Sequence, residues 1–242
     1  MKLGYAFEIV ITAQDVERSV QFYKRLGYQP LNDPSSPSSD SLLTDGMIRL
    51  RLQQGSAWKA NLIYFADDVR EKAEALETLG VTIDKELNTN GQIPQVSFTD
   101  PSGLKVQLLQ LERSSLVLPS NKPISKAGRF GELSIETDDF SRSLDFWMKL
   151  GFEPTECSPV PPDTWASLTD GPLMVGIYKR GHLQHIIKTP TIAYFDDDMA
   201  ERIQGLKQEG FEFVQEFPGP DGQTAHAVIE APEGQLIFLF GS

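Results

Sequence analysis

The sequence has little of what metal and redox sites commonly need. It contains one cysteine, Cys157, and three histidines in 242 residues. A single thiol cannot form an internal disulfide, and thiolate metal sites draw on several cysteines or on cysteine together with histidine. We therefore predict that Cys157 is a structural residue and that the protein belongs to a reducing compartment.

Long apolar runs and an excess of basic residues are also missing. No run approaches the roughly 18 apolar residues that cross a bilayer, and the opening Met-Lys-Leu-Gly-Tyr-Ala does not resemble a secretory signal. The 34 acidic residues outnumber the 22 basic ones and give a net charge of −12, which repels nucleic acids and anionic lipids. We expect a cytoplasmic protein without nucleic-acid or membrane partners. The negative charge either attracts cationic small molecules or simply maintains solubility.

The motifs of acyl and phosphoryl transfer do not occur either. The chain has no glycine-rich phosphate loop, no Gly-x-Ser-x-Gly turn and no Cys/His pair in a nucleophilic arrangement. These reaction classes are therefore disfavoured.

What the sequence does have is an internal repeat. "FEIVITAQDVERSVQFYKRLGY" at residues 7–28 returns as "GELSIETDDFSRSLDFWMKLGF" at residues 131–152. Later phrases follow in the same order, such as "LIYFADDVREKAEALETLGV" and "IAYFDDDMAERIQGLKQEGF". A repeat of the whole first half predicts two domains of one fold. We place them at residues 1–112 and 129–242, joined by a Ser-, Pro- and Lys-rich linker at 113–128.

Each half contains a smaller unit twice. Residues 8–14 alternate as a strand does, Asp15 is suited to cap a helix, and apolar positions then recur at helical spacing until Gly27. A second unit follows, with Asp67 or Asp68 as the helix cap and strands expected at 61–66, 81–86, 93–99 and 104–111. The pattern predicts four β-α-β-β-β modules, with "DPSG" and "APEG" as turns between the last two strands of each half.

These phrases resemble the vicinal oxygen chelate superfamily, which includes glyoxalase I, bleomycin-resistance proteins and extradiol dioxygenases. The likeness rests on "QDVERSVQFYKRLGY", "DDFSRSLDFWMKLGF" and "DPSGLKVQLL", and it covers nearly all residues apart from the linker. It implies an α+β fold of tandem glyoxalase-like domains. Each domain would pair two modules into a cup-shaped sheet that holds the ligand.

The resemblance also indicates where a metal would be held. Metal-dependent members usually place histidine or glutamate at three strand positions, which fall here on Glu8, Asn61 and Gln107 in the first half and on Glu132, Thr191 and Phe238 in the second. One carboxylate with two amide oxygens suits only a weakly held hard cation, and phenylalanine is not a ligand. We therefore expect no cofactor. The alternative is a weakly bound divalent metal in the N-terminal cup, with Glu8 and Gln107 as candidates.

The histidines separate into two groups. His182 and His185 lie in a basic stretch that opposes cation binding, and they are predicted to be surface residues. His226 aligns with Gln95 on a strand that lines the cup in the resembled superfamily. It either contacts a ligand or is a hydrogen-bonded strand histidine.

Glu8 and Glu132 recur on a predicted inward face, where a carboxylate needs compensation. Each either pairs with a basic side chain, stays protonated with a raised pKa, or awaits a cationic or hydrogen-bond-donating ligand. Both halves keep the glutamate while other positions diverge, which favours ligand binding.

Aromatic residues provide further candidates. Trp165 follows a Pro-rich loop and is expected at a pocket mouth, with Trp58 in the same role in the first half. The aromatic residues at periodic spacing are expected in the core: Tyr23, Tyr64, Trp147 and Tyr194.

Two functional interpretations follow. The first is a protein that binds a small cationic or aromatic molecule in a largely metal-free cup, with ligand contacts expected from Glu8, Asn61, Gln95, Gln107, Glu132, Trp165, Thr191 and His226. The second is a lyase, isomerase or dioxygenase-type enzyme with a degenerate metal site, or one that uses Glu8 or Glu132 as a general base. The chain is expected to be a monomeric pseudo-dimer or a homodimer. The loops at 32–41 and 158–164 are either lids over the cups or plain connectors.

Overall fold

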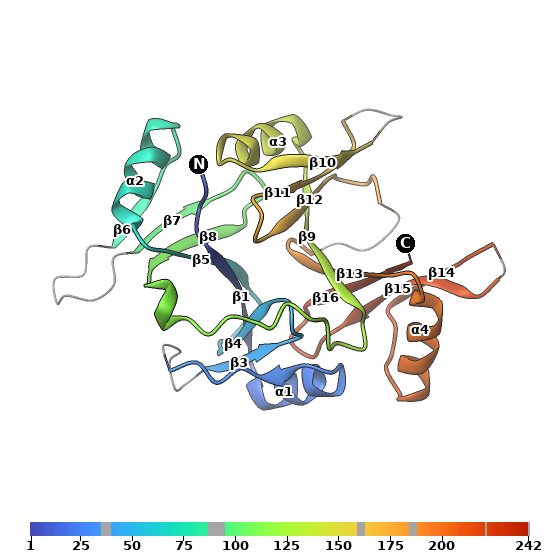
Figure 1. Cartoon of the computed structure of the whole chain (residues 1–242). Helices are drawn as coiled ribbons and strands as arrows, with labels where there is room; N and C mark the ends of the chain where they lie inside the picture. The colour runs from blue at the N-terminus through green and yellow to red at the C-terminus, as the bar shows by residue number, and fades with distance from the viewer. Residues whose placement is uncertain (35–39, 87–94, 159–162, 184–187, 221, 242) are drawn as a thin grey trace.

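The computed structural model contains two eight-stranded sheets (Figure 1) and describes residues 1–34, 40–86, 95–158, 163–183, 188–220 and 222–241. Sheet A consists of β1 (Ala6–Ala13), β2 (Gln29–Pro30), β3 (Ser41–Thr44), β4 (Arg49–Gln54), β5 (Ala60–Ala66), β6 (Asp84–Glu86), β7 (Gln95–Thr99) and β8 (Lys105–Gln110). Sheet B consists of β9 (Arg129–Thr137), β10 (Glu153–Cys157), β11 (Trp165–Thr169), β12 (Met174–Lys179), β13 (Thr191–Asp196), β14 (Gln215–Pro218), β15 (Thr224–Glu230) and β16 (Leu236–Gly241).

The two sheets have the same topology. Their strand orders are β2-β3-β4-β1-β5-β8-β7-β6 and β10-β11-β12-β9-β13-β16-β15-β14. The helices are α1 (Val16–Arg25), α2 (Val69–Thr78), α3 (Phe140–Lys149) and α4 (Met199–Gln208), and η1 (Arg113–Ser115) is a 3₁₀ turn. Each sheet is thus built from two β-α-β-β-β modules. The predicted repeat and the α+β fold are confirmed.

Local sequence signals account for the helix ends. Asp15 caps α1 by accepting a hydrogen bond from the Arg18 amide at 2.9 Å, and Asp68 caps α2 through the Glu71 amide, also at 2.9 Å. Gly27 follows α1 with a φ of 100°, which glycine adopts without strain. Asp68, rather than Asp67, is therefore the second cap.

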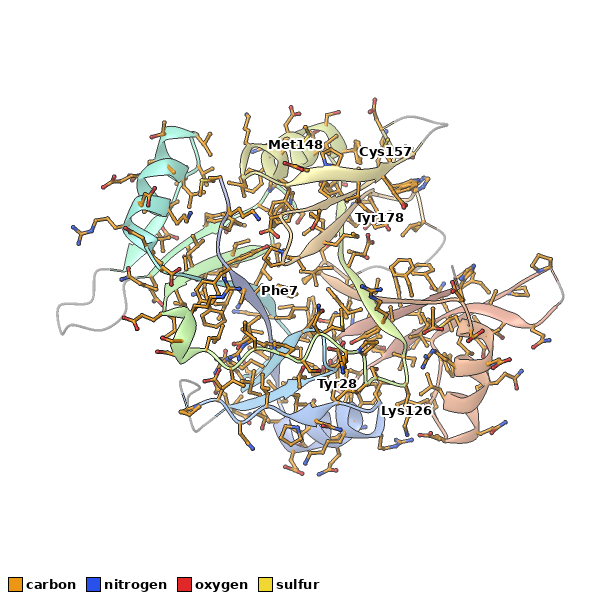
Figure 2. The ribbon with its side chains drawn as sticks, in the orientation of Figure 1. Phe7, Tyr28, Lys126, Met148, Cys157 and Tyr178 are labelled. Carbon is orange, nitrogen blue, oxygen red and sulfur yellow. The ribbon has the colours of Figure 1, made fainter. Side chains whose placement is uncertain are left out.

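Each sheet has a face covered by helices and an opposite face that carries Glu8 or Glu132, which we call the cup face. The helix-covered faces of both halves share one hydrophobic core, in which the ring centroids of Phe7 and Phe130 lie 6.2 Å apart. Phe7 lies near the middle of the molecule (Figure 2). The four aromatic residues expected in the core are fully buried: Tyr23, Tyr64, Trp147 and Tyr194.

The two halves contact each other through matched polar pairs within this core. The Tyr194 hydroxyl of the second half donates to Asp45 of the first at 2.6 Å. At the equivalent place, Tyr64 of the first half lies beside Asp170 of the second. Burial and then the Asp170 carboxylate raise the pKa of Tyr64. The halves are therefore arranged as a pseudo-symmetric pair.

The first helix of each half packs on a turn of the other half. Tyr23 on α1 donates to Glu233 in the "APEG" turn at 2.7 Å. Trp147 on α3 donates through Nε1 to Asp100 in the "DPSG" turn at 3.1 Å. These turns therefore serve the interface as well as their own hairpins.

Residues 113–128 join the two sheets and run along the first half (Figure 1). Leu116 packs in a cluster on the cup face of sheet A that includes Val10 and Phe65. Further on, the Ile124 amide donates to the Asp45 carbonyl at 2.8 Å. The linker is thus bonded to the first half before it enters β9. Within the described residues, no helix combines the length and apolar character of a membrane span.

Burial raises the pKa of three interface aspartates, Asp45, Asp100 and Asp170. Such a carboxyl group binds its proton more tightly in the folded protein than in the unfolded chain. The resulting stabilisation is complete below the unfolded pKa of about 3.9 and is lost as the pH rises through the folded pKa. At neutral pH, the hydrogen bonds to these groups offset the cost of their burial.

We expect Asp45→Asn to gain stability relative to wild type as the pH rises from about 4 to about 7. The asparagine oxygen can still accept from the Met47 and Ile48 amides, while its NH₂ group donates to the Tyr194 hydroxyl. Urea unfolding of both proteins across this range measures the difference. Asp67→Asn, at an exposed position, is the control with an expected pH-independent difference. A pH-independent difference for Asp45→Asn would contradict the prediction.

Candidate functional site on the cup faces

Glu8, in the middle of β1, belongs to a row of side chains that crosses the cup face of sheet A. Ile63 on β5 is directly opposite Glu8, and Gln107 on β8 is opposite Ile63. Asn61 pairs with Val10, one step further along the strands. The neighbour of Glu8 on β5 is therefore the apolar Ile63 and not Asn61, because residues on one face of a strand alternate in steps of two.

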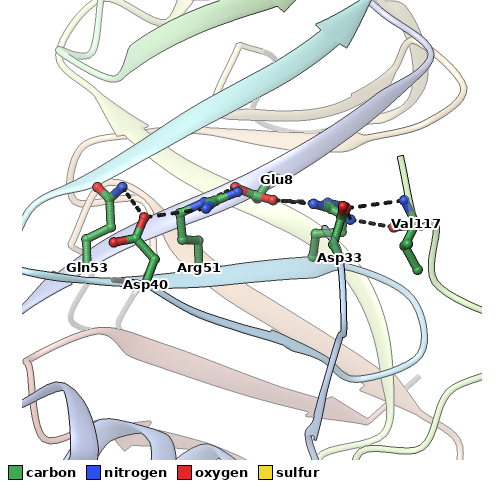
Figure 3. A network of polar contacts seen from close by, with 7 residues as sticks. Glu8, Asp33, Asp40, Arg51, Gln53 and Val117 are labelled. Atoms are coloured by element: carbon green, nitrogen blue, oxygen red, sulfur yellow. Dashed lines mark hydrogen bonds and ion pairs between the residues drawn. The ribbon is translucent and has the colours of Figure 1, made fainter. Parts of the chain in front are cut away.

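Glu8 is fully buried and paired with two arginines of β4 (Figure 3). Arg49 donates through Nε to Glu8 Oε2 at 3.0 Å, and Arg51 donates through Nε to Glu8 Oε1. Arg49 also pairs with Asp33 at 2.8 Å, while Arg51 Nη1 lies 3.4 Å from Asp40. We call this set of alternating charges the ion chain. It provides the first of the three expected forms of compensation, a basic partner.

The ion chain also holds the segments that border the cup face. Arg49 Nη1 donates to the Val117 carbonyl in the linker, and the Val117 amide donates to Asp33 at 3.2 Å. At the other end, Gln53 donates to Asp40 at 2.9 Å. The linker and both ends of the loop at 32–41 are thus bonded to the Glu8 row. Residues 35–39 of that loop and 159–162 of its counterpart lie outside the described residues, so their predicted role as lids stays a prediction.

Glu132 lies in the corresponding row of sheet B. Ala193 on β13 is opposite Glu132, and Phe238 on β16 is opposite Ala193. Thr191 is one step further along β13, and its hydroxyl donates to the Lys188 carbonyl at 2.7 Å. Two of the three side chains in this row are therefore apolar.

Three hydroxyl groups compensate the buried Glu132 carboxylate. Ser134 and Tyr178 donate to Oε1 at 2.8 and 2.7 Å, and Ser167 donates to Oε2 at 2.8 Å. No lysine or arginine in the described part of the chain forms an ion pair with Glu132. Burial and the Glu132 charge raise the pKa of Tyr178, so its hydroxyl remains a donor.

Two strand positions create this difference, and Met174 holds the place of Arg49 at the first of them. Arg51 lies opposite Val10 in sheet A, and its counterpart Gly176 lies opposite Ser134 in sheet B. A Cβ atom on Gly176 would overlap the Glu132 carboxylate. The first half thus has the Arg51 guanidinium at this position, whereas in the second half Gly176 leaves space that the Glu132 carboxylate occupies. The arginines were not among the candidates predicted from the sequence, although their alternation in "RLRL" at 49–52 places two charges on one face of a buried strand.

Aromatic side chains flank Glu132 on both sides of its row. On one side, Trp165 pairs with Tyr178 across β11 and β12. Both are half-buried, and Tyr178 reaches Glu132 directly. Trp165 thus lies on the cup face, and its expected place at a pocket mouth stays a prediction.

On the other side, three phenylalanines form a cluster. Phe195 and Phe240 are stacked with centroids 5.4 Å apart, and Phe238 meets Phe240 edge-on, also at 5.4 Å. Gly131, at a register shift between β9 and β13, leaves room for the Phe195 ring, which a Cβ atom would overlap.

His226 extends this cluster. Its ring lies 5.7 Å from Phe240, and Phe217 is opposite it on β14. Nδ1 accepts a hydrogen bond from the Gly241 amide at 3.0 Å, so the neutral ring carries its proton on Nε2. Gln95, half-buried on β7, holds the equivalent place in sheet A.

Three of the remaining predicted residues, His182, Cys157 and Trp58, are not part of either row. His182 is exposed, and His185 is outside the described residues. Cys157 is an exposed residue of the edge strand β10. Trp58 lies at the interface of the halves rather than at a cup, where its Nε1 donates to Gln235 at 3.3 Å.

Neither row suits a divalent metal. The guanidinium groups on both oxygens of Glu8 oppose a cation, and Ala193 and Phe238 beside Glu132 provide no ligand atom. Across the described ranges, no three His, Cys, Asp or Glu side chains are grouped closely enough to hold a metal ion. The donor sets therefore do not fit the metal that the resemblance implies for metal-dependent members.

We expect Arg49→Met to lower the free energy of unfolding by about 3–5 kcal/mol, because Glu8 and Asp33 remain buried with one guanidinium fewer. Urea unfolding measures the loss. The double variant Glu8→Gln with Arg49→Met should lose less, since one buried charge goes with its partner. Arg18→Met, at an exposed position, is the control. A loss below about 1 kcal/mol for Arg49→Met would contradict a structural role for the ion chain.

We expect the chelator-treated protein to give no saturable calorimetric signal with Mn²⁺, Ni²⁺ or Zn²⁺, because Glu8 is neutralised by Arg49 and Arg51. Elemental analysis of the purified protein provides the second readout. Stoichiometric metal that disappears in Glu8→Ala would show that the arginines yield to a cation and would overturn this expectation.

Comparison with known proteins agrees with the architecture. Residues 6–108 match the family described as the Glyoxalase/Bleomycin resistance protein/Dioxygenase superfamily. No curated protein sequence matches the chain. A variant of homoprotocatechuate 2,3-dioxygenase from Brevibacterium fuscum superposes with a TM-score of 0.66 at 15% identity, covering 98% of this chain and 71% of the other.

Two further structures are similar to the same extent. The Mn(II)-bound glyoxalase from Novosphingobium aromaticivorans gives a TM-score of 0.66 at 15% identity, covering 96% of this chain and 79% of the other. Homoprotocatechuate 2,3-dioxygenase from Arthrobacter globiformis gives 0.66 at 16% identity, with coverages of 98% and 79%. At these identities the likeness shows the fold alone. Together with the repeated sheet, it shows that the chain contains two glyoxalase-like domains, the first of which matches the Glyoxalase/Bleomycin resistance protein/Dioxygenase superfamily over residues 6–108.

Proposed function

We propose that the protein binds a small aromatic molecule on the cup face of its second domain and does so without a metal ion. The observation that carries the proposal is the aromatic surface on both sides of Glu132, formed by Trp165, Tyr178, Phe195, Phe217, His226, Phe238 and Phe240.

The exposure of these rings supports a binding role. Phe238 is buried at the base of the cluster, whereas Trp165, Phe195 and Phe240 remain half-buried. A half-buried ring such as Trp165 on this face offers a stacking surface for another ring. Ligand sites combine such apolar walls with a few polar groups, and Glu132 with its hydroxyl donors is the polar group here.

The first domain provides a contrast that supports a ligand site in the second. The residues equivalent to Phe238, Phe240 and His226 are Gln107, Leu109 and Gln95. The cup face of the first domain also contains the ion chain and Leu116 of the linker. The two cup faces therefore differ in chemistry although they share a fold.

The metal in the Mn(II)-bound glyoxalase is not carried over to this chain. Ala193 and Phe238 occupy the row beside Glu132, and neither supplies a ligand atom. The proposal is therefore binding of an organic molecule by side chains alone.

A panel of small aromatic compounds tests the proposal by thermal shift, with calorimetry on each compound that stabilises the protein. We expect saturable binding of one molecule per chain that Phe240→Ala weakens about tenfold, as the loss of one ring contact implies.

Leu109→Ala is the matched control, because Leu109 holds the place of Phe240 in the first domain. It should leave the affinity unchanged. Trp165→Phe should remove a ligand-induced change in tryptophan fluorescence while binding persists. Affinity that is lost in Leu109→Ala but kept in Phe240→Ala would move the site to the first domain and contradict the proposal.

A further inference from the structure

We infer that the ligand carries a positive charge, as a protonated or quaternary amine attached to an aromatic ring, and that Glu132 recognises this charge. The inference rests on the proposed function, since it names the class of molecule that the same site would take.

The hydrogen bonds of Glu132 leave one acceptor position free. A carboxylate accepts about four hydrogen bonds, two on each oxygen. Oε1 accepts from Ser134 and Tyr178, whereas Oε2 accepts from Ser167 alone among the described residues. The free position belongs to a side chain that is only 2% exposed. The N–H group of a protonated amine would complete the set, whereas a quaternary amine would interact with Glu132 through its charge alone.

Among the described residues, no lysine or arginine forms an ion pair with Glu132. Its three partners are neutral hydroxyls. Burial of a carboxylate is costly unless an opposite charge accompanies it. At the equivalent place, Glu8 is paired with two guanidinium groups. A cationic ligand would give Glu132 the positive charge that Arg49 and Arg51 give Glu8.

The flanking rings suit the same charge. The faces of aromatic rings attract ammonium groups, with a gain of about 0.5–2 kcal/mol that increases as water is removed. Trp165 and Tyr178 on one side and the phenylalanine cluster on the other place such faces around the carboxylate. Glu156 adds a further negative charge close enough to act on Tyr178. An anionic ligand would meet repulsion in this site.

Gly176 determines this specificity, because it leaves the space that the carboxylate occupies. An arginine at this position, as Arg51 is in the first domain, would give Glu132 a permanent partner. The cationic ligand would then have no charge left to neutralise.

Calorimetry with four probes that share one ring tests the inference: protonated 2-phenylethylamine, phenyltrimethylammonium, 2-phenylethanol and phenylacetate. We expect the two cations to bind at least about tenfold more tightly than the alcohol, and phenylacetate to bind most weakly. Glu132→Gln should bring the amine and the alcohol to within about threefold of each other, since it removes the charge and keeps the shape. Gly176→Arg should have the same effect if it folds, as circular dichroism will show. Glu136→Gln, on the same strand, is the control that should keep the preference for cations.

The outcomes separate the two proposals. Equal affinities of wild type for the amine and the alcohol would overturn the charge inference and leave the aromatic site in place. A preference for cations that persists in Glu132→Gln would overturn the role of Glu132. The absence of binding by all four probes would overturn both proposals. The wild-type comparison needs no variant, so the inference stays falsifiable even if Glu132→Gln does not fold.

Discussion

A carboxylate on the central strand of each domain loses its water on folding, and the character of each cup face follows from how the protein compensates this loss. In the first domain, Arg49 and Arg51 surround Glu8. Two buried guanidinium groups then need acceptors of their own, which Asp33 and Asp40 provide. The compensation therefore spreads from one strand to a loop and the linker, and it fills the cup face.

In the second domain the same problem is solved locally. Hydroxyl groups on three adjacent strands donate three hydrogen bonds to Glu132 without bringing in further charges. Gly176 holds the place of Arg51, so this guanidinium is missing from the aromatic face of the second domain. Two replacements on β12, Met174 in the place of Arg49 and Gly176 in the place of Arg51, thus accompany the change from a charged face to an aromatic one.

The sequence was sufficient for most of the fold. The repeat, the caps at Asp15 and Asp68, and the hairpin turns are local signals that act within a few residues, so they can be recognised without knowledge of the tertiary structure. The positions of Glu8 and Glu132 on inward faces followed from strand alternation.

The site was harder to predict from the sequence, because it depends on which residues of distant strands lie opposite each other. A shift of two residues on β5 exchanges Asn61 for Ile63 as the neighbour of Glu8, and no local signal fixes that register. The register shift at Gly131 is likewise set by contact with the Phe195 ring on β13. Prediction of the arginine partners of Glu8 would have required the knowledge that β4 lies beside β1 and runs parallel to it.

The bond between Arg49 and the Val117 carbonyl has a consequence for assembly. Two chains of this kind, each with two similar domains, are candidates for domain swapping, in which the second domain of one chain packs on the first domain of another. Such an exchange requires the connecting segment to leave its own first domain. Here that segment is held by a buried guanidinium at Val117 and by the backbone at Ile124. An exchanged arrangement would therefore have to break the bonds between the ion chain and the linker.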